Sequence, residues 1–138
     1  MRALLYSGMV LALAACTAPA PLGPPASPAL GPALTSAEIR DAVVGQTGTG
    51  SITGSTITFA MYLAPDGAAL ARRPTGIERG QWRLTNDGEL CLRWQTYRQG
   101  EEYCQNAYRE GRMLRFQDTK SAQLLAFEPG NQLANTER

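Results

Sequence analysis

The chain has 138 residues, with 13 lysines and arginines against 12 aspartates and glutamates, and it contains no histidine. The near balance of charge does not indicate a nucleic-acid-binding protein, since neutralising phosphates takes a basic excess. The lack of histidine excludes Ser-His and Cys-His nucleophile pairs and metal sites built from imidazoles.

The first 15 residues are typical of an export signal. Met1 and Arg2 provide a positive charge, and an apolar run extends from Ala3 to Leu13. This run is too short to cross a bilayer, which takes roughly 20 residues, and small residues follow it. We therefore expect residues 1–15 to be a signal peptide and the protein to be exported.

The stretch Leu13-Ala14-Ala15-Cys16 resembles the lipobox of bacterial lipoproteins. The resemblance implies that the sulfur of Cys16 receives a diacylglyceryl group, that cleavage precedes Cys16, and that the new amine is acylated, as with palmitate. Two or more acyl chains make a stable membrane anchor. In that family, a residue other than aspartate after the cysteine, here Thr17, favours the outer membrane with the protein facing the periplasm. The inner membrane and the cell surface stay open as alternatives.

Residues 16–33 combine the cysteine of the lipobox with a proline-rich segment. Six prolines lie between positions 17 and 33, and such segments are stiff, extended and unable to form a core. We interpret this segment as a tether that holds a folded domain away from the membrane. A polyproline ligand for a partner domain is the alternative interpretation.

The folded domain is expected over residues 34–130, followed by a flexible tail at 131–138. Thr35 and Glu38 occupy the positions of a capping box, which predicts a helix over 36–44. Beyond it, apolar residues alternate with polar ones between recurring turn signals, as in an antiparallel meander. The expected strands are 47–53, 55–63, 67–73, 78–85, 89–95, 101–109, 112–117 and 122–127.

The predicted fold class is therefore mainly β, a small barrel or curled sheet of about eight strands with one short N-terminal helix. The large side chains decide whether such a barrel is filled or open to a ligand. Alternation turns four of them inward, namely Phe59, Trp82, Trp94 and Phe116. We expect them to fill the barrel.

With Cys16 assigned to a lipid, Cys91 and Cys104 are expected to form a disulfide, because exported proteins fold in an oxidising compartment. Two free buried thiols are the alternative. A disulfide needs Cα atoms within about 7 Å, so the two cysteines should lie directly opposite each other. This register gives a four-residue loop, 96–99, and further cross-strand pairs. Those pairs are Leu92 with Tyr103 and Arg93 with Glu102.

The same register assigns side chains to the two faces of the sheet. Leu90, Leu92, Trp94, Tyr103 and Ala107 are expected to face inward, and Cys91, Cys104, Arg93 and Tyr108 outward. A disulfide on the outer face needs another part of the chain to shield it from solvent. We expect the helix at 36–44 to cover it.

No residue set predicts catalysis, a metal site or a cofactor. Glu101 and Glu102 are adjacent and point to opposite faces of a strand, so they cannot act as a facing carboxylate pair. The glycine-rich stretch 45–54 lacks the lysine and the helix of a phosphate-binding loop. We read it as a hairpin between two strands.

The frame GQWRLTNDGELC, EEYC and YREG resembles small exported bacterial domains with Gly-x-Trp, Asp-Gly and Cys…Cys signatures. The whole architecture is similar to periplasmic inhibitors of proteases and lysozymes, which have lipocalin-like barrels. The resemblance implies a non-catalytic binding or inhibitor module that is tethered to a membrane and contacts another envelope protein. A structural subunit of an envelope assembly and a carrier of a small ligand are the alternatives.

Recognition by such a module is expected at the rim of the barrel. Tyrosine and arginine are frequent anchors in protein interfaces. The candidate binding residues on or near the predicted turns are Arg72, Arg73, Tyr97 and Arg98.

Overall fold

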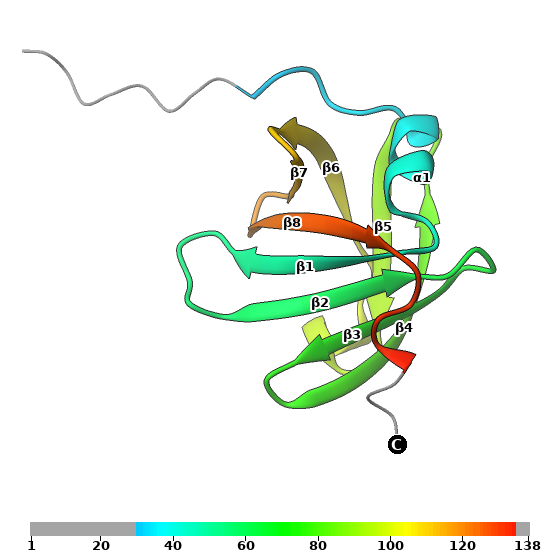
Figure 1. The fold of residues 1–138 in the computed structure, drawn as a ribbon, viewed down its shortest axis with the longest axis vertical. Helices are drawn as coiled ribbons and strands as arrows, with labels where there is room; N and C mark the ends of the chain where they lie inside the picture. Colours follow the sequence, from blue (N-terminus) through cyan, green and yellow to red (C-terminus); the bar gives the residue numbers. More distant parts are fainter. Residues whose placement is uncertain (1–29, 135–138) are drawn as a thin grey trace, which may run out of the picture.

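The computed structural model describes residues 30–134. The predicted signal peptide, Cys16 and most of the tether lie outside these residues. The described chain forms a closed barrel of eight antiparallel strands with one short α-helix (Figure 1), which confirms the predicted fold class. The elements are α1 (Ser36–Val43), β1 (Gln46–Ile52), β2 (Thr58–Leu63), β3 (Ala68–Arg73), β4 (Gly76–Leu84), β5 (Glu89–Trp94), the 3₁₀ turn η1 (Tyr97–Gly100), β6 (Tyr103–Glu110), β7 (Met113–Gln117) and β8 (Ala122–Pro129).

The barrel is a meander in which each strand pairs with the next along the chain, and β1 pairs with β8 to close it. Its two ends differ. The helix end holds α1 and the turns 64–67 and 85–88, whereas the loop end holds the turns 74–75, 95–102 and 118–121.

The helix begins where the capping box predicts. The backbone N–H of Thr35 donates to Glu38 Oε2 at 2.8 Å, and the N–H of Glu38 donates to Thr35 Oγ1 at 3.3 Å. Two orphan donors of the first turn are thereby satisfied. The chain leaves the helix at Gly45, whose φ of 75° lies in the left-handed region, where glycine pays no steric penalty.

The position of α1 differs from the expectation. Ile39 and Val43 are fully buried and belong to the interior core cluster, so the helix inserts its apolar side into one end of the barrel. Two bonds hold it there: Leu34 N–H donates to the carbonyl of Ala107 at 2.8 Å, and the Ser36 hydroxyl donates to the carbonyl of Thr85. Burial of Ile39 and Val43 in the core stabilises this position.

The interior is filled by large side chains, as predicted. Phe59, Trp82, Trp94 and Phe116 are 8%, 8%, 2% and 0% exposed. The Trp82 indole N–H donates to the carbonyl of Ala64 at 2.8 Å, near the barrel end, so its one polar atom is satisfied. The predicted inward face of β5 and β6 is also buried, from Leu90 at 0% to Tyr103 at 8%.

Some boundaries differ from the sequence pattern. β2 begins at Thr58, and the apolar Ile57 before it lies in the turn and is 48% exposed. At the other end of the domain, Leu133 is fully buried, and the N–H of Gln132 donates to Thr47 Oγ1 at 2.9 Å. The packed domain therefore extends to at least Leu133, into the segment 131–138 that we expected to be a tail.

Candidate functional site

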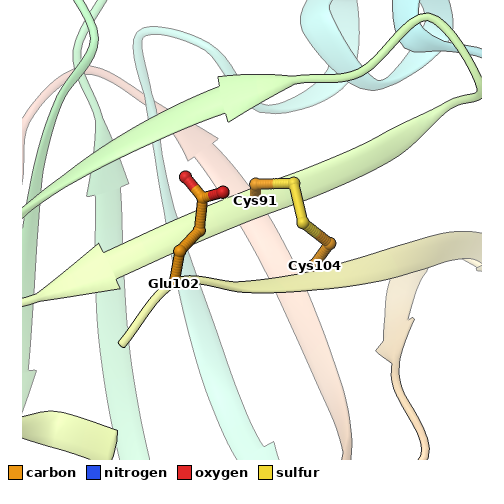
Figure 2. A group of neighbouring side chains, drawn as sticks. All are labelled: Cys91, Glu102 and Cys104. Carbon is orange, nitrogen blue, oxygen red and sulfur yellow. A yellow bond between two sulfur atoms is a disulfide. The ribbon is translucent and has the colours of Figure 1, made fainter. Parts of the chain in front are cut away.

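The disulfide forms in the predicted register. Cys91 and Cys104 lie directly opposite each other, with Cα atoms 3.9 Å apart, and the next pair is Leu92 with Tyr103. A carboxylate oxygen of Glu102 lies within 4.8 Å of both sulfur atoms (Figure 2). Because each sulfur is bonded to the other, this group of three does not offer thiolate ligands to a metal.

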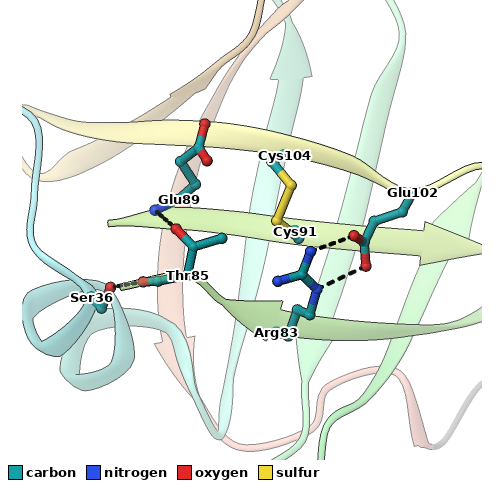
Figure 3. The surroundings of a disulfide bond; sticks show 7 residues. All are labelled: Ser36, Arg83, Thr85, Glu89, Cys91, Glu102 and Cys104. Atoms are coloured by element: carbon teal, nitrogen blue, oxygen red, sulfur yellow. Dashed lines mark hydrogen bonds and ion pairs between the residues drawn. A yellow bond between two sulfur atoms is a disulfide. The ribbon is translucent and has the colours of Figure 1, made fainter. Parts of the chain in front are cut away.

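The expected pair of Arg93 and Glu102 is not formed. The ladder between β5 and β6 ends at Leu92 and Tyr103, and Glu102 binds Arg83 of β4 instead, through bonds of 2.5 and 3.0 Å (Figure 3). These hydrogen bonds lower the pKa of Glu102 and raise that of Arg83. Bidentate geometry favours this partner, since both carboxylate oxygens are used at once. The ion pair, not the helix, lies beside the disulfide.

Glu78 organises the loop end. Its Oε1 accepts hydrogen bonds from Thr96 N, Thr96 Oγ1 and Tyr97 N at 2.7, 2.7 and 2.8 Å, and its Oε2 accepts one from Arg73 at 2.9 Å. Burial raises the pKa of Glu78, but these hydrogen bonds outweigh burial and lower the pKa to about 2. Glu78 is therefore an anion that fixes the loop 95–102 to the barrel.

The bonds to Glu78 explain why this loop is wider than the predicted four-residue turn. Thr96 and Tyr97 turn their N–H groups toward Glu78, so the strands separate after Leu92. The chain returns through Arg98 and Gln99, which have φ values of 54° and 59°. Left-handed backbone costs non-glycine residues about 1–2 kcal/mol each. The contacts of Glu78 and Arg98 offset that strain.

Two of the candidate binding residues, Arg73 and Arg98, lie against aromatic rings. The Cζ of Arg73 is 4.1 Å from the centre of the Tyr97 ring, and the Cζ of Arg98 is 4.0 Å from that of Tyr103. Both arginine side chains are only 18% exposed. Cation–π contacts of this kind stabilise most where water is excluded. These side chains close the loop end and do not project from it.

Asp118, in the turn after β7, also helps to close the loop end of the barrel. It forms an ion pair with Arg98 at 2.8 Å, and its Oδ1 accepts from the N–H groups of Lys120 and Ser121, both at 2.7 Å. Burial raises the pKa of Asp118, but these bonds outweigh burial and lower it. Asp118, like Glu78, is therefore ionised near neutral pH, whereas a general acid or base works best with a pKa near the working pH.

Tyr103 is neutral in this surrounding. Its hydroxyl oxygen accepts from the indole N–H of Trp94 at 2.9 Å, and burial raises its pKa to about 12. The edge of its ring meets Tyr97, with centroids 5.8 Å apart. The loop end thus combines three aromatic rings, two guanidinium groups and two carboxylates in one network.

Gln105 is a buried polar residue of the described core whose amide group has no partner. It faces inward on β6, is 1% exposed, and has no hydrogen-bond partner for either amide heteroatom. A buried polar group without a partner costs about 1–3 kcal/mol. Gln105 is therefore a source of instability near the closed loop end.

Replacing Gln105 by methionine should stabilise the protein, because the shape is kept and two unpartnered polar atoms are removed. We expect a gain of about 1 kcal/mol, which corresponds to a rise of about 4–8 °C in Tm for a domain of this size. Thermal unfolding followed by circular dichroism measures it. Gln117→Met makes the same change at an exposed position and should leave Tm unchanged; a fall in Tm with Gln105→Met would contradict the prediction.

The outer face of β3, β4 and β5 holds a groove that the sequence reasoning missed. Three adjoining depressions of about 290, 180 and 430 Å³ meet at the exposed side chain of Gln81. We call them together the β4 groove. The fourth candidate binding residue, Arg72, lies on the same outer face and is exposed. The other residues around the groove are Asp66, Gly67, Ala68, Arg79, Gly80, Trp82, Arg83, Arg93, Trp94, Gln95 and Glu102.

The alternation of residues along β4 is a sequence signal that could have indicated the groove. Arg79, Gln81 and Arg83 alternate with Glu78, Gly80 and Trp82, so one face of this strand is basic and polar while the other faces the core. The neighbouring strand β5 adds Arg93 opposite Gln81.

No protein-family model, curated protein or solved structure matches this chain. Among residues 30–134, no helix has the length and apolar character needed to cross a membrane.

Proposed function

We propose that this protein is a non-catalytic binding module, tethered to the outer membrane by a lipid on Cys16 and facing the periplasm, that recognises another envelope protein with the outside of its barrel. The observation that carries the proposal is the filled barrel closed at both ends. Ile39 and Val43 occupy the helix end, and the network around Glu78 closes the loop end.

The filled interior favours this function over that of a small-ligand carrier. A carrier barrel needs an enclosed cavity of roughly 300 Å³ or more that buries most of its ligand. Here the centre holds Trp94, Leu92 and Phe116 at 2%, 1% and 0% exposure. The surface depressions described for residues 30–134 lie on the outside of the barrel, where they are bordered by exposed side chains such as Gln81, Arg93 and Glu101.

A binding role also agrees with the state of the buried acids. Burial raises the pKa values of Glu78 and Asp118, but hydrogen bonds from the backbone and from side chains outweigh it and lower both. Acids that stay ionised suit structural closure better than proton transfer at neutral pH. A structural subunit of an envelope assembly would use the same outer surface. It differs in being permanently assembled.

The proposal is tested with the full chain, purified in a mild detergent and immobilised. We expect it to retain one envelope protein in a fixed ratio through repeated purification, and native mass spectrometry to find no small molecule at one per chain. Sustained hydrolysis of a peptide, ester or glycan by the pure protein would contradict the proposal. So would a lipid or pigment that co-purifies in equal amount.

The lipid anchor is tested separately by Cys16→Ser. The variant should lose labelling by a fatty-acid probe and migrate as an unprocessed chain, because only a thiol can take the diacylglyceryl group. Cys91→Ser serves as the control, since it removes a cysteine of the folded domain and should retain the label. A variant at position 16 that remains labelled and membrane-bound would refute the anchor.

A further inference from the structure

We propose that residues 130–134 form a latch over an apolar surface on the outside of the barrel, and that this surface binds a leucine-bearing turn of the partner protein when the latch opens. We call these residues the C-terminal latch. This role rests on the proposed function, because it names the surface and the chemistry by which the partner is recognised.

Leu133 is buried outside the interior core. Its side chain is 0% exposed, yet it does not belong to the interior core cluster. The latch leaves β8 after Pro129, and in Figure 1 the red ribbon passes across the end of β2 on the near side of the barrel. Leu133 therefore packs against the outer face of the sheet.

The outer face beneath the latch carries apolar side chains. The residues on either side of Tyr62 and of Leu70 belong to the interior core cluster, so Tyr62 and Leu70 themselves face outward. Both are nevertheless partly buried, and Ala60 on the same face is only 2% exposed. Tyr62 lies opposite Thr47 on β1 and opposite Leu70 on β3. We call these three residues the outer row.

Thr47 joins the latch to the outer row. Its hydroxyl donates to the carbonyl of Gly130 at 2.7 Å and accepts from the N–H of Gln132 at 2.9 Å. The side chain is only 3% exposed, although it lies on the outer face with Tyr62. Both groups that Thr47 binds belong to the backbone. A segment of another protein can therefore offer the same carbonyl and N–H with different side chains.

A local turn presents the leucine of the latch. Oδ1 of Asn131 accepts from the N–H groups of Leu133 and Ala134 at 3.0 and 3.1 Å. Turns of this kind form between neighbouring residues, so they do not depend on the barrel. A partner segment with asparagine two residues before leucine can form the same turn, and this is the chemistry we assign to the partner.

Few contacts hold the latch closed. Leu133 is the one buried side chain within residues 130–134. Beside the two bonds of Thr47, the N–H of Gly130 donates to the carbonyl of Gly45 at 2.9 Å. Ordering a chain segment costs conformational entropy, which offsets much of what one leucine and three hydrogen bonds contribute. Such a segment opens locally while the rest of the domain stays folded.

Hydrogen exchange of the full chain, followed residue by residue by NMR in a mild detergent, tests the latch. Thr47→Val keeps the branched shape but removes both bonds to the latch, and Leu133→Ala removes its buried side chain. We expect each variant to speed exchange of the Gly130 amide about fivefold or more, because this amide is protected only while the latch is closed. Exchange of the amides within β5 should not change.

Two control variants make the same chemical changes away from the latch. Thr49→Val lies on the same strand and is exposed, and Leu124→Ala lies partly buried on β8. Both should leave exchange of the Gly130 amide at the rate of the parent. Unchanged exchange in Thr47→Val and Leu133→Ala would overturn the latch.

A peptide with the sequence of the latch tests the surface beneath it. The capped peptide PGNQLA, which corresponds to residues 129–134, is titrated into the full chain. We expect Leu133→Ala to bind it about tenfold more tightly than the parent does, because a surface that is mostly occupied lowers the apparent affinity. Adding Thr47→Val should remove most of this gain. The peptide PGNQSA, without the leucine, should not bind.

Two results of this titration would overturn the surface as a binding site. One is an equal Kd for the parent and Leu133→Ala, since the latch would then not compete with the peptide. The other is equal binding of the leucine and serine peptides, since the outer row would then not recognise the leucine. Thermal unfolding of each variant confirms that it is folded before its Kd is compared.

Failure of this inference is distinguishable from failure of the proposed function. In the retention experiment, Leu133→Ala should retain several-fold more of the envelope partner than the parent, and Leu124→Ala the same amount as the parent. If the parent and Leu133→Ala retain the partner equally well, the outer row is not the recognition surface although the module still binds. If neither retains a partner, the proposed function itself fails.

Discussion

Replacing Cys91 and Cys104 together by alanine should lower the free energy of unfolding by about 3 kcal/mol, because the disulfide restricts the unfolded chain. The two cysteines are separated by 13 positions in the sequence. For a domain of about 100 residues the loss corresponds to a fall of about 12–24 °C in Tm. Thermal unfolding by circular dichroism, under oxidising conditions, measures the difference from the parent.

The double variant avoids a free thiol, since Cys91 is fully buried while Cys104 is partly exposed. Adding reductant to the parent should reproduce most of the loss, and adding it to the double variant should change nothing. Cys16→Ser is the control for removal of a cysteine outside the barrel and should keep the parent's Tm. An unchanged Tm in the double variant would show that the disulfide does not stabilise the barrel.

Replacing Glu78 by glutamine should destabilise the protein near neutral pH and flatten its response to acid. Glu78 has a pKa lowered from 4.5 to about 2 in the folded state. A lowered pKa means that folding favours the ionised form, so the stabilisation is complete above pH 4.5 and is lost as the pH falls toward 2. At about 1.4 kcal/mol per pH unit, the contribution is about 3 kcal/mol.

Unfolding by urea at pH 7, 4 and 2.5 measures this contribution. The parent should lose stability progressively below about pH 4.5, whereas Glu78→Gln should start lower and lose less. Part of the stability that Glu78→Gln loses at pH 7 comes from Arg73, because this arginine would remain partly buried without the carboxylate of Glu78. Glu101→Gln is the control, as an exposed carboxylate of the same loop. Parallel acid profiles for the parent and Glu78→Gln would contradict the assignment.

The disulfide and Glu78 stabilise different parts of the barrel. The disulfide fixes the register of β5 and β6 on the outer face, and Glu78 fixes the loop that leads from one to the other. Loss of Glu78 should therefore free the loop 95–102 and the left-handed backbone of Arg98 and Gln99. Loss of the disulfide acts mainly on the unfolded chain.

The amino-acid sequence by itself determined the helix cap, the eight strands and the register of the disulfide. Each of these depends on residues that are close in the chain or on a simple period. Thr35 and Glu38 are three residues apart, inward and outward side chains alternate, and a disulfide permits few separations between its Cα atoms. These short-range rules hold before the barrel closes.

Only the tertiary structure decided where α1 packs, which acid binds which arginine, and where the β4 groove lies. Ile39 and Val43 could cover either the outer face or one end of the barrel, and the structure buries them in the core at that end. Long charged side chains reach several partners at similar distances, so local spacing could not separate Arg83 from Arg93 as the partner of Glu102. The groove appears only when the register between β4 and β5 brings Arg79, Gln81 and Arg93 together across strands, because that juxtaposition depends on how two strands pair and not on spacing within one strand.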